Sequence, residues 1–241
     1  MPGRIPQIFG AGGCFFVEPW QEPLLQRHLL SLAGVPVPRI CFLGTANGDN
    51  PADIEQFYRQ MGRHACRPSH LKLFEPHTDR FRAWFLEHDI IYVGGGATRN
   101  LMALWEEWGI VAALHDAWQA GVVLAGTSAG SICWFEGCIT DSLPARMLPL
   151  RCTGFLAGSG CTHYDARPDR PAAFRRYLLE GRIPFPGIAT ENHTALHYRG
   201  RELFEVVTAR RGSKAWRLTR RGDAIVEAPL DARLLEGSAS A

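Results

Sequence analysis

Three short apolar runs along the chain each end in small residues. They are RICFLGTA (39–46), DIIYVGGG (89–96) and VVLAGTS (122–128). Segments whose apolar residues recur at helical spacing are found at 52–62, 98–109, 112–121 and 170–181. Buried strands that alternate with amphipathic helices predict a parallel sheet with helices on both faces.

The pattern changes after Pro144. Residues 187–207 are expected to form two strands joined by a turn at 199–201, and 214–230 to form further antiparallel strands. Because no linker or internal repeat interrupts the chain, we expect a single α/β domain over residues 1–236. Residues 237–241 are small and polar, and we expect them to form a disordered tail.

Composition narrows the class of protein. The chain has 241 residues, of which 46 % are hydrophobic and 21 % charged, so it can bury one substantial core. A net charge of +2 predicts no nucleic-acid partner, and no apolar stretch is long enough for a membrane span or a secretory signal. The seven cysteines form no C-x-x-C pair, which favours free thiols in a cytoplasmic protein.

The segment GTSAG (126–130) places Ser128 between two glycines directly after a predicted strand. This Gly-x-Ser-x-Gly spacing is typical of a strand-to-helix turn that exposes a nucleophilic serine, although a purely structural turn would have the same spacing. A nucleophile also needs two N–H groups facing the developing oxyanion. The amide of Ala129 could supply one, and Gly95 or Gly96 at the neighbouring strand end the other.

A serine nucleophile also requires a base and a group that orients this base. His163 is the leading candidate for the base, because it lies in a loop-like stretch without core periodicity. His193 and His197 are spaced as metal ligands on a helix would be, but their segment is predicted to be a strand, so no zinc site is expected. The acid could be Asp141, Asp165 or Glu191, and the residues alone do not rank Glu191 far above Asp141.

Four blocks together identify a family: 90–109, 126–142, 162–170 and 187–200. In this order they resemble the peptidase E and cyanophycinase family of serine peptidases. The resemblance implies a three-layer α/β sandwich with a mostly parallel central sheet, like that of class I glutamine amidotransferases, plus C-terminal antiparallel strands. It also implies Ser128 as nucleophile and His163 as base. Glu191 matches the position of the acid in the cyanophycinase-like branch, and Asp141 best matches the acid assigned in the aspartyl dipeptidase branch. We favour Glu191.

The resemblance further implies a serine peptidase that releases N-terminal aspartate from dipeptides, with no metal or cofactor. Arg167, Arg170 and Tyr164, which follow His163 closely or directly, are the candidates for binding the substrate. Exposed strand edges in the C-terminal region are compatible with a homodimer. Two alternatives remain open: an amidase, esterase or cyanophycinase-like hydrolase of the same fold, and a non-catalytic module that uses the glycine-rich turns at 10–13 and 94–96 to bind anions.

Overall fold

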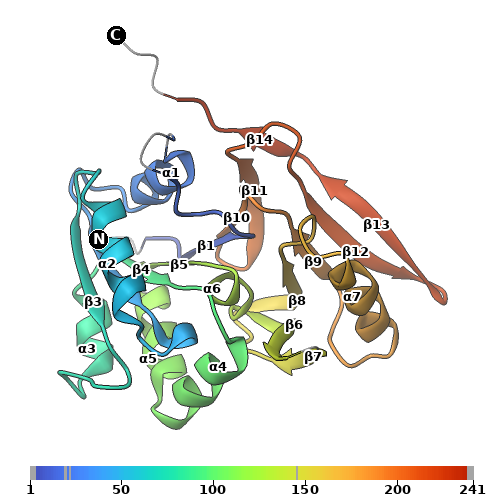
Figure 1. Cartoon of the computed structure of the whole chain (residues 1–241), viewed down its shortest axis with the longest axis horizontal. Coiled ribbons are helices and arrows are strands. Elements are labelled where there is room, and N and C mark those ends of the chain that lie inside the picture. Colours follow the sequence, from blue (N-terminus) through green and yellow to red (C-terminus); the bar gives the residue numbers. More distant parts are fainter. Residues whose placement is uncertain (1–3, 19–20, 22, 145, 238–241) are drawn as a thin grey trace.

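An eight-stranded mixed sheet forms the centre of the molecule within the described residues, which are 4–18, 21, 23–144 and 146–237 of this computed structural model (Figure 1). In their order across the sheet, the strands are β14 (Ala232–Leu234), β11 (Glu202–Thr208), β10 (Thr194–Arg199), β1 (Gln7–Ala11), β5 (Val123–Thr127), β4 (Ile90–Val93), β2 (Arg39–Leu43) and β3 (Arg67–Leu71).

Five adjacent strands of this sheet, from β1 to β3, run parallel. Strand β10 pairs antiparallel with β1, and β11 pairs antiparallel with β10. The parallel strands are covered on both faces, which explains why their sequences are continuous apolar runs rather than alternating ones. All four residues of β4, for example, are buried. The three strands predicted from these runs are confirmed.

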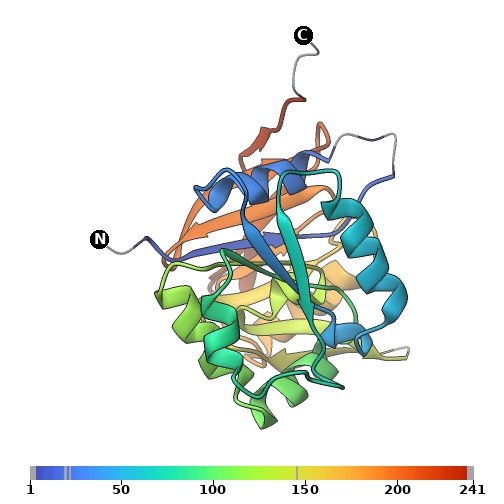
Figure 2. The same ribbon diagram turned by 90° about the vertical axis from the view of Figure 1, so that its left-hand side faces the viewer.

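Helices cover both faces of this sheet. They are α1 (Leu24–Leu32), α2 (Pro51–Met61), α3 (Phe81–Leu86), α4 (Thr98–Glu107) and α5 (Ile110–Gln119). Leu29 of α1 and Phe57 of α2 pack in one buried cluster, while Leu101 of α4 and Leu114 of α5 belong to another on the opposite face. Figure 2 shows α2 and α3 on opposite sides of the edge strands. The expected three-layer α/β sandwich is therefore confirmed.

A second sheet of six strands packs beside the first in the part of the chain that the structure describes (Figure 1). Its order is β13 (Ala224–Leu230), β12 (Ala215–Arg221), β9 (Gly187–Thr190), β8 (Leu156–Thr162), β6 (Phe135–Leu143) and β7 (Arg146–Arg151). Phe135 and Ile188 join the core of the first sheet, together with residues of the short helix α6 (Ala129–Ile132). The other face is covered by α7 (Asp169–Leu179) through Phe174 and Leu178.

The structure corrects the number of strands expected after Pro186. Residues 187–207 form three strands instead of two, because the chain leaves the second sheet after β9 and enters the first as β10. Asp141 lies on β6, and His163 directly follows β8 in a loop, as expected. Short strands with polar residues, such as β6, lack the apolar run that marked the central strands. The turn at 199–201 and the antiparallel pair β12–β13 are confirmed.

The predicted tail lies outside the described residues from position 238 onward. All seven cysteines are free thiols. Among the described residues, the helices are too short or too polar for any of them to cross a membrane.

The helix layer gives a direct test of packing. Leu114 is fully buried between α5 and the sheet, whereas Leu179, at the end of α7, is exposed. Because truncation of a buried leucine leaves a cavity, we expect Leu114→Ala to lower the free energy of unfolding by about 2–5 kcal/mol. The matched variant Leu179→Ala should change it by less than about 1 kcal/mol. Urea unfolding followed by tryptophan fluorescence measures both, and equal losses would contradict this packing.

Candidate active site

Ser128 lies at the tip of a tight turn between β5 and α6. Its backbone has φ 53° and ψ −114°, a conformation that non-glycine residues rarely adopt. Only glycine fits at the two flanking positions, 126 and 130. A Cβ atom at Gly126 would lie 2.2 Å from the carbonyl oxygen of Gly130, and one at Gly130 would lie 2.2 Å from that of Val93. The Gly-x-Ser-x-Gly spacing therefore reflects a turn pressed against β4, and this turn presents the serine side chain.

His163 comes from the other sheet and meets Ser128 at the strand ends. The imidazole Nε2 lies 2.9 Å from Ser128 Oγ, within hydrogen-bonding distance. The last residue of β1 and the loop that follows it hold both residues. The Ser128 amide donates to the Ala11 carbonyl and the His163 amide to the Gly12 carbonyl, each over 3.1 Å. This segment thus fixes the serine relative to the histidine, as expected for a nucleophile and its base.

The partner of His163 on the other side is an amide instead of a carboxylate. His163 Nδ1 lies 2.7 Å from Asn192 Oδ1, so the imidazole donates its Nδ1–H to the side-chain oxygen of Asn192. The neutral tautomer that results has its lone pair on Nε2, which faces Ser128. A base that must accept a proton from the serine needs this tautomer.

The expected contact between Glu191 and His163 is therefore corrected. The Glu191 carboxylate accepts hydrogen bonds from the Lys214 amide at 2.8 Å and from Trp216 Nε1 at 2.9 Å. Glu191 directs its side chain toward β12 because residues 191–193 form a turn between β9 and β10, not the start of a strand. In this turn, neighbouring side chains point in different directions, and Asn192 is the one that reaches the imidazole.

Asn192 is itself held by its surroundings. Its backbone amide donates to Asp165 Oδ1 at 2.9 Å, and Arg210 Nη2 pairs with Asp165 Oδ2 at 3.0 Å. Gly13 covers the contact from the β1 side: a Cβ atom there would lie 2.1 Å from Asn192 Oδ1 and 2.6 Å from His163 Cε1. Only glycine at position 13 leaves room for the row of Ser128, His163 and Asn192.

The alternative acid, Asp141, is engaged by two arginines. Arg170 Nη2 lies 3.0 Å and Arg167 Nη1 lies 2.9 Å from Asp141 Oδ2. Burial disfavours the charged carboxylate, but the two guanidinium groups outweigh this effect and lower the pKa of Asp141. Asp141 makes no hydrogen bond to His163 among the described residues.

The three candidates for substrate binding differ in accessibility. The Arg170 side chain is only 5 % exposed and also donates to the Thr162 carbonyl, whereas the Arg167 side chain is 47 % exposed. Tyr164 is buried in the core under α7, so its side chain is not available to a substrate, contrary to expectation. Tyrosine directly after a strand is easily taken for a surface residue, because the sequence does not show that α7 covers it.

The expected oxyanion donors lie beside the serine. A Cβ atom at Gly95 would be 3.3 Å from Ser128 Cβ, so the glycine-rich turn after β4 reaches the nucleophile, as predicted. Gly96 has φ 135°, and a Cβ there would lie 2.4 Å from the Ala46 carbonyl oxygen. No backbone hydrogen bond of the described residues uses the amide of Gly95, Gly96 or Ala129 as donor. These N–H groups are free for a negatively charged oxygen.

The surroundings of His163 lower its pKa. Burial is the main cause, since it disfavours the imidazolium form, and the positive charge of Arg170 acts in the same direction. The hydrogen bond to Asn192 and the charges of Asp141 and Asp165 oppose this shift. His163 is therefore neutral, and able to accept a proton, at neutral pH.

Two residues of the site, Asn192 and Gly13, are not found by a search for acids. Asn192 stands next to the glutamate that was considered, and an Asn does orient the histidine in some cysteine peptidases. Gly13 belongs to a glycine-rich turn that could equally bind an anion. In both cases the residue type was visible, but its contact depends on how β1 and β10 pair.

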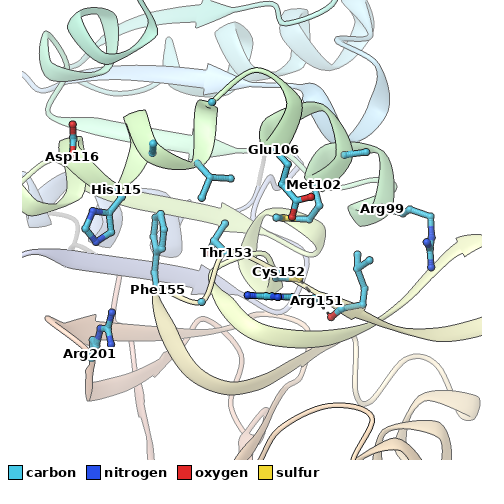
Figure 3. A pocket seen from close by; sticks show the side chains of 16 residues that line it. Arg99, Met102, Glu106, His115, Asp116, Arg151, Cys152, Thr153, Phe155 and Arg201 are labelled. Carbon is cyan, nitrogen blue, oxygen red and sulfur yellow. Dashed lines mark hydrogen bonds between the residues drawn. The ribbon is translucent and has the colours of Figure 1, made fainter.

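A large surface pocket lies elsewhere. About 1000 Å³ in volume, it separates α4 and α5 from the chain between β7 and β8, and its walls include Met102, Phe155 and Arg151 (Figure 3). None of Ser128, His163 and Asn192 lines it. Each of these three residues is partly exposed at the strand ends.

A serine on a strained strand-to-helix turn, paired with a neutral histidine on an α/β sandwich, defines a site of the serine-hydrolase type. The model of Peptidase family S51 matches residues 11–206, which include every member of this site. The chain belongs to this family.

Similar proteins agree with this assignment. The chain is 43 % identical to the uncharacterized peptidase YgaJ of Bacillus subtilis (strain 168) over 224 residues, which are 93 % of this chain and 96 % of the relative. Among solved structures, a peptidase from an acI-B1 actinobacterium has a TM-score of 0.70 at 21 % identity, with 95 % of each chain covered. A putative peptidase E from Listeria monocytogenes EGD-e has a TM-score of 0.60 at 14 % identity, with 94 % of this chain and 100 % of the other covered. At these identities, the two structures support the fold alone.

The contacts of His163 predict that substitutions at Asn192 and at its neighbour Glu191 affect kcat differently. Asn192→Ala removes the acceptor that orients the imidazole, and we expect it to lower kcat for a small activated ester by about 10²-fold. Glu191→Gln should leave kcat close to the wild-type value, because this side chain contacts Lys214 and Trp216. Thermal unfolding of both variants controls for the fold. A large loss with Glu191→Gln and none with Asn192→Ala would contradict the assignment.

The low pKa of His163 predicts the acid limb of the pH profile. Because the neutral imidazole is the base, kcat/KM should fall only below the ordinary histidine pKa of about 6.5. Asp141→Asn removes a charge that raises the pKa of His163, so the limb should move to lower pH. Asn192→Asp should move it to higher pH, since a carboxylate on Nδ1 favours imidazolium. Shifts in the opposite directions would overturn this electrostatic account, and Asp223→Asn, at an exposed aspartate, is the control.

Proposed function

We propose that this chain is a serine peptidase that hydrolyses dipeptides with an N-terminal aspartate through an acyl-enzyme. The observation that carries the proposal is the row of Ser128 Oγ, His163 Nε2 and Nδ1, and Asn192 Oδ1, with separations of 2.9 and 2.7 Å. Membership of Peptidase family S51 supports peptide hydrolysis as the reaction.

The reaction begins with attack by Ser128 Oγ on the scissile carbonyl carbon. His163 Nε2 accepts the hydroxyl proton and returns it to the leaving amine, which departs and leaves an ester on Ser128. Water then attacks this ester, with His163 again as base, and releases the free carboxylic acid. The amides of Ala129 and of Gly95 or Gly96 stabilise the oxyanion in both steps, where loss of one donor typically costs about 3 kcal/mol.

Asn192 orients the imidazole but carries no charge. A carboxylate in its place would stabilise the imidazolium that forms during the reaction. Here the negative charges that favour imidazolium come from Asp165, which binds the Asn192 amide, and from Asp141. These more distant carboxylates take over part of the electrostatic role, while Asn192 keeps the orienting role.

Preference for aspartate is assigned to Arg167. This guanidinium is half-exposed and lies four residues after His163. It could bind a substrate carboxylate in addition to Asp141. Arg170 is buried against Asp141 and the Thr162 carbonyl, and it holds Asp141 in place instead of contacting substrate. Charge-assisted hydrogen bonds of this kind favour an acidic side chain over its neutral isostere.

One observation favours a second candidate, a hydrolase of uncharged small peptides or amides with the same catalytic row. Arg167 is already paired with Asp141 and Asp169, and Arg170 with Asp141, so two carboxylates balance two guanidinium groups. A substrate carboxylate would have to compete with these partners for Arg167.

The two candidates are separated by a panel of Asp-Leu, Asn-Leu and Leu-Leu dipeptides in the presence of EDTA. We expect cleavage of Asp-Leu that Ser128→Ala lowers by at least about 10⁴-fold. Arg167→Ala should lower kcat/KM for Asp-Leu by about 10–100-fold and leave Leu-Leu unchanged, since it removes one charged hydrogen-bond donor.

Arg176→Ala is the matched control, because Arg176 is an exposed arginine that pairs with Glu180 on α7. Equal cleavage of all three dipeptides, unaffected by Arg167→Ala, would support the second candidate. Absence of any Ser128-dependent turnover would contradict both, and loss of activity in EDTA would contradict a metal-free reaction.

A further inference from the structure

A second cluster of chemically active side chains lies outside the catalytic row. His28 on α1, His197 on β10 and Glu205 on β11 each present one ligand atom, and these atoms all lie within 4.8 Å of one another. Glu205 Oε1 is 3.3 Å from His28 Nε2 and 3.3 Å from His197 Nδ1. Within the described part of the chain, none of these three side chains forms a hydrogen bond with Ser128, His163 or Asn192.

The neighbours of His197 fix which of its nitrogens carries the proton. Gln7 Nε2 donates to the Leu32 carbonyl at 3.3 Å, so Gln7 Oε1 is the atom that faces His197 Nε2, at 2.9 Å. An amide oxygen only accepts, so Nε2 carries the hydrogen. The neutral imidazole then directs the lone pair of Nδ1 at the carboxylate oxygen of Glu205, which is also an acceptor.

His28 brings a second imidazole to this cluster. Within the described residues, its Nε2 is buried and has no hydrogen-bond partner. A cation between these three side chains would give the unpartnered Nε2 of His28 a ligand contact, and it would also be bound by Nδ1 of His197 and the carboxylate of Glu205.

The two separations from Glu205 Oε1 fit a tetrahedral metal ion. With zinc–ligand distances of about 2.0–2.1 Å, two ligand atoms of a tetrahedral site lie about 3.3 Å apart. Both measured separations from Glu205 Oε1 have this value. They are longer than the about 2.7–2.9 Å typical of a hydrogen bond between imidazolium and carboxylate.

The remaining contacts resemble the outer contacts that orient metal ligands. Arg233 binds Glu205 Oε2 through Nη2 at 2.6 Å and Nε at 3.2 Å, which leaves Oε1 to the two imidazoles. Gln7 fixes the tautomer of His197, as the second partner of a metal-bound histidine commonly does. The Arg233 side chain is 56 % exposed, so water screens its charge from the ion.

We propose that His28 Nε2, His197 Nδ1 and Glu205 Oε1 form a Zn²⁺ site that joins α1 to β10 and β11. Three protein ligands leave a fourth position for water on the side where His28 and Glu205 reach the surface. The ion would link the helix to the antiparallel part of the central sheet. Its effect is on stability, because Ser128 and His163 need no metal.

The test uses the full chain, stripped with EDTA and freed of chelator. Calorimetric titration with Zn²⁺ should give one ion per chain, and Co²⁺ in its place should show the visible absorption of a tetrahedral site. Saturating Zn²⁺ should raise the unfolding temperature by about 5–10 °C when its concentration is about 100 times Kd. The Ser128-dependent activity should stay the same, which separates this proposal from the proposed function.

Two ligand variants and one control complete the experiment. His28→Ala and Glu205→Gln should each abolish the Co²⁺ spectrum and the thermal shift, while His77→Ala, at an exposed histidine, should retain both. Unfolding in EDTA shows whether each variant is folded, and His28→Gln replaces His28→Ala if that variant is not. No saturable Zn²⁺ binding to the wild type, or binding that survives both ligand variants, would overturn the proposal.

Discussion

The hydrogen bond between Ser128 and His163 is the contact on which the site depends, because its two ends belong to different sheets. Ser128 follows a strand of the central parallel sheet, and His163 follows a strand of the second sheet. A separation of 2.9 Å between Oγ and Nε2 requires that the two sheets are held in one fixed position relative to each other. The packing of Phe135, Ile188 and α6 between them is therefore part of the catalytic geometry.

The end of β1 and the loop after it fix how the two sheets lie relative to each other. The carbonyl groups of Ala11, the last residue of β1, and of Gly12 accept hydrogen bonds from the amides of Ser128 and His163, and the carbonyl of Gly13 accepts one from the amide of His193. Glycines at 12 and 13 allow this approach, since a Cβ atom at either position would overlap atoms of residues 190–192. One short segment thus holds the serine, the histidine and the turn that carries Asn192. Backbone contacts, rather than a buried ion pair, orient the row.

Much of the fold could be predicted from the sequence, because parallel strands buried on both faces leave continuous apolar runs. The runs at 39–46, 89–96 and 122–128 led to the correct central strands and placed the glycine turn at 94–96 beside Ser128. His163 was also placed next to Ser128 correctly. The second sheet was largely missed, because β6 and β7 mix polar with apolar residues and carry no single period.

The sequence could not show which of two adjacent side chains points toward the histidine. Glu191 and Asn192 are adjacent, and only the turn between β9 and β10 determines that Asn192 faces the imidazole while Glu191 faces Trp216. The cluster of His28, His197 and Glu205 shows the same limit. His197 was considered together with its sequence neighbour His193, but its partners in space come from a helix near the N-terminus and from the adjacent strand.

The central claim is that His163 activates Ser128, and covalent labelling tests it most directly. A fluorophosphonate probe, followed by mass spectrometry of the peptides, should give a single adduct on Ser128. The labelling rate should fall by about 10²–10⁴-fold in His163→Ala, since this variant loses the general base. Absence of an adduct on Ser128, or an equal rate in the variant, would contradict the account.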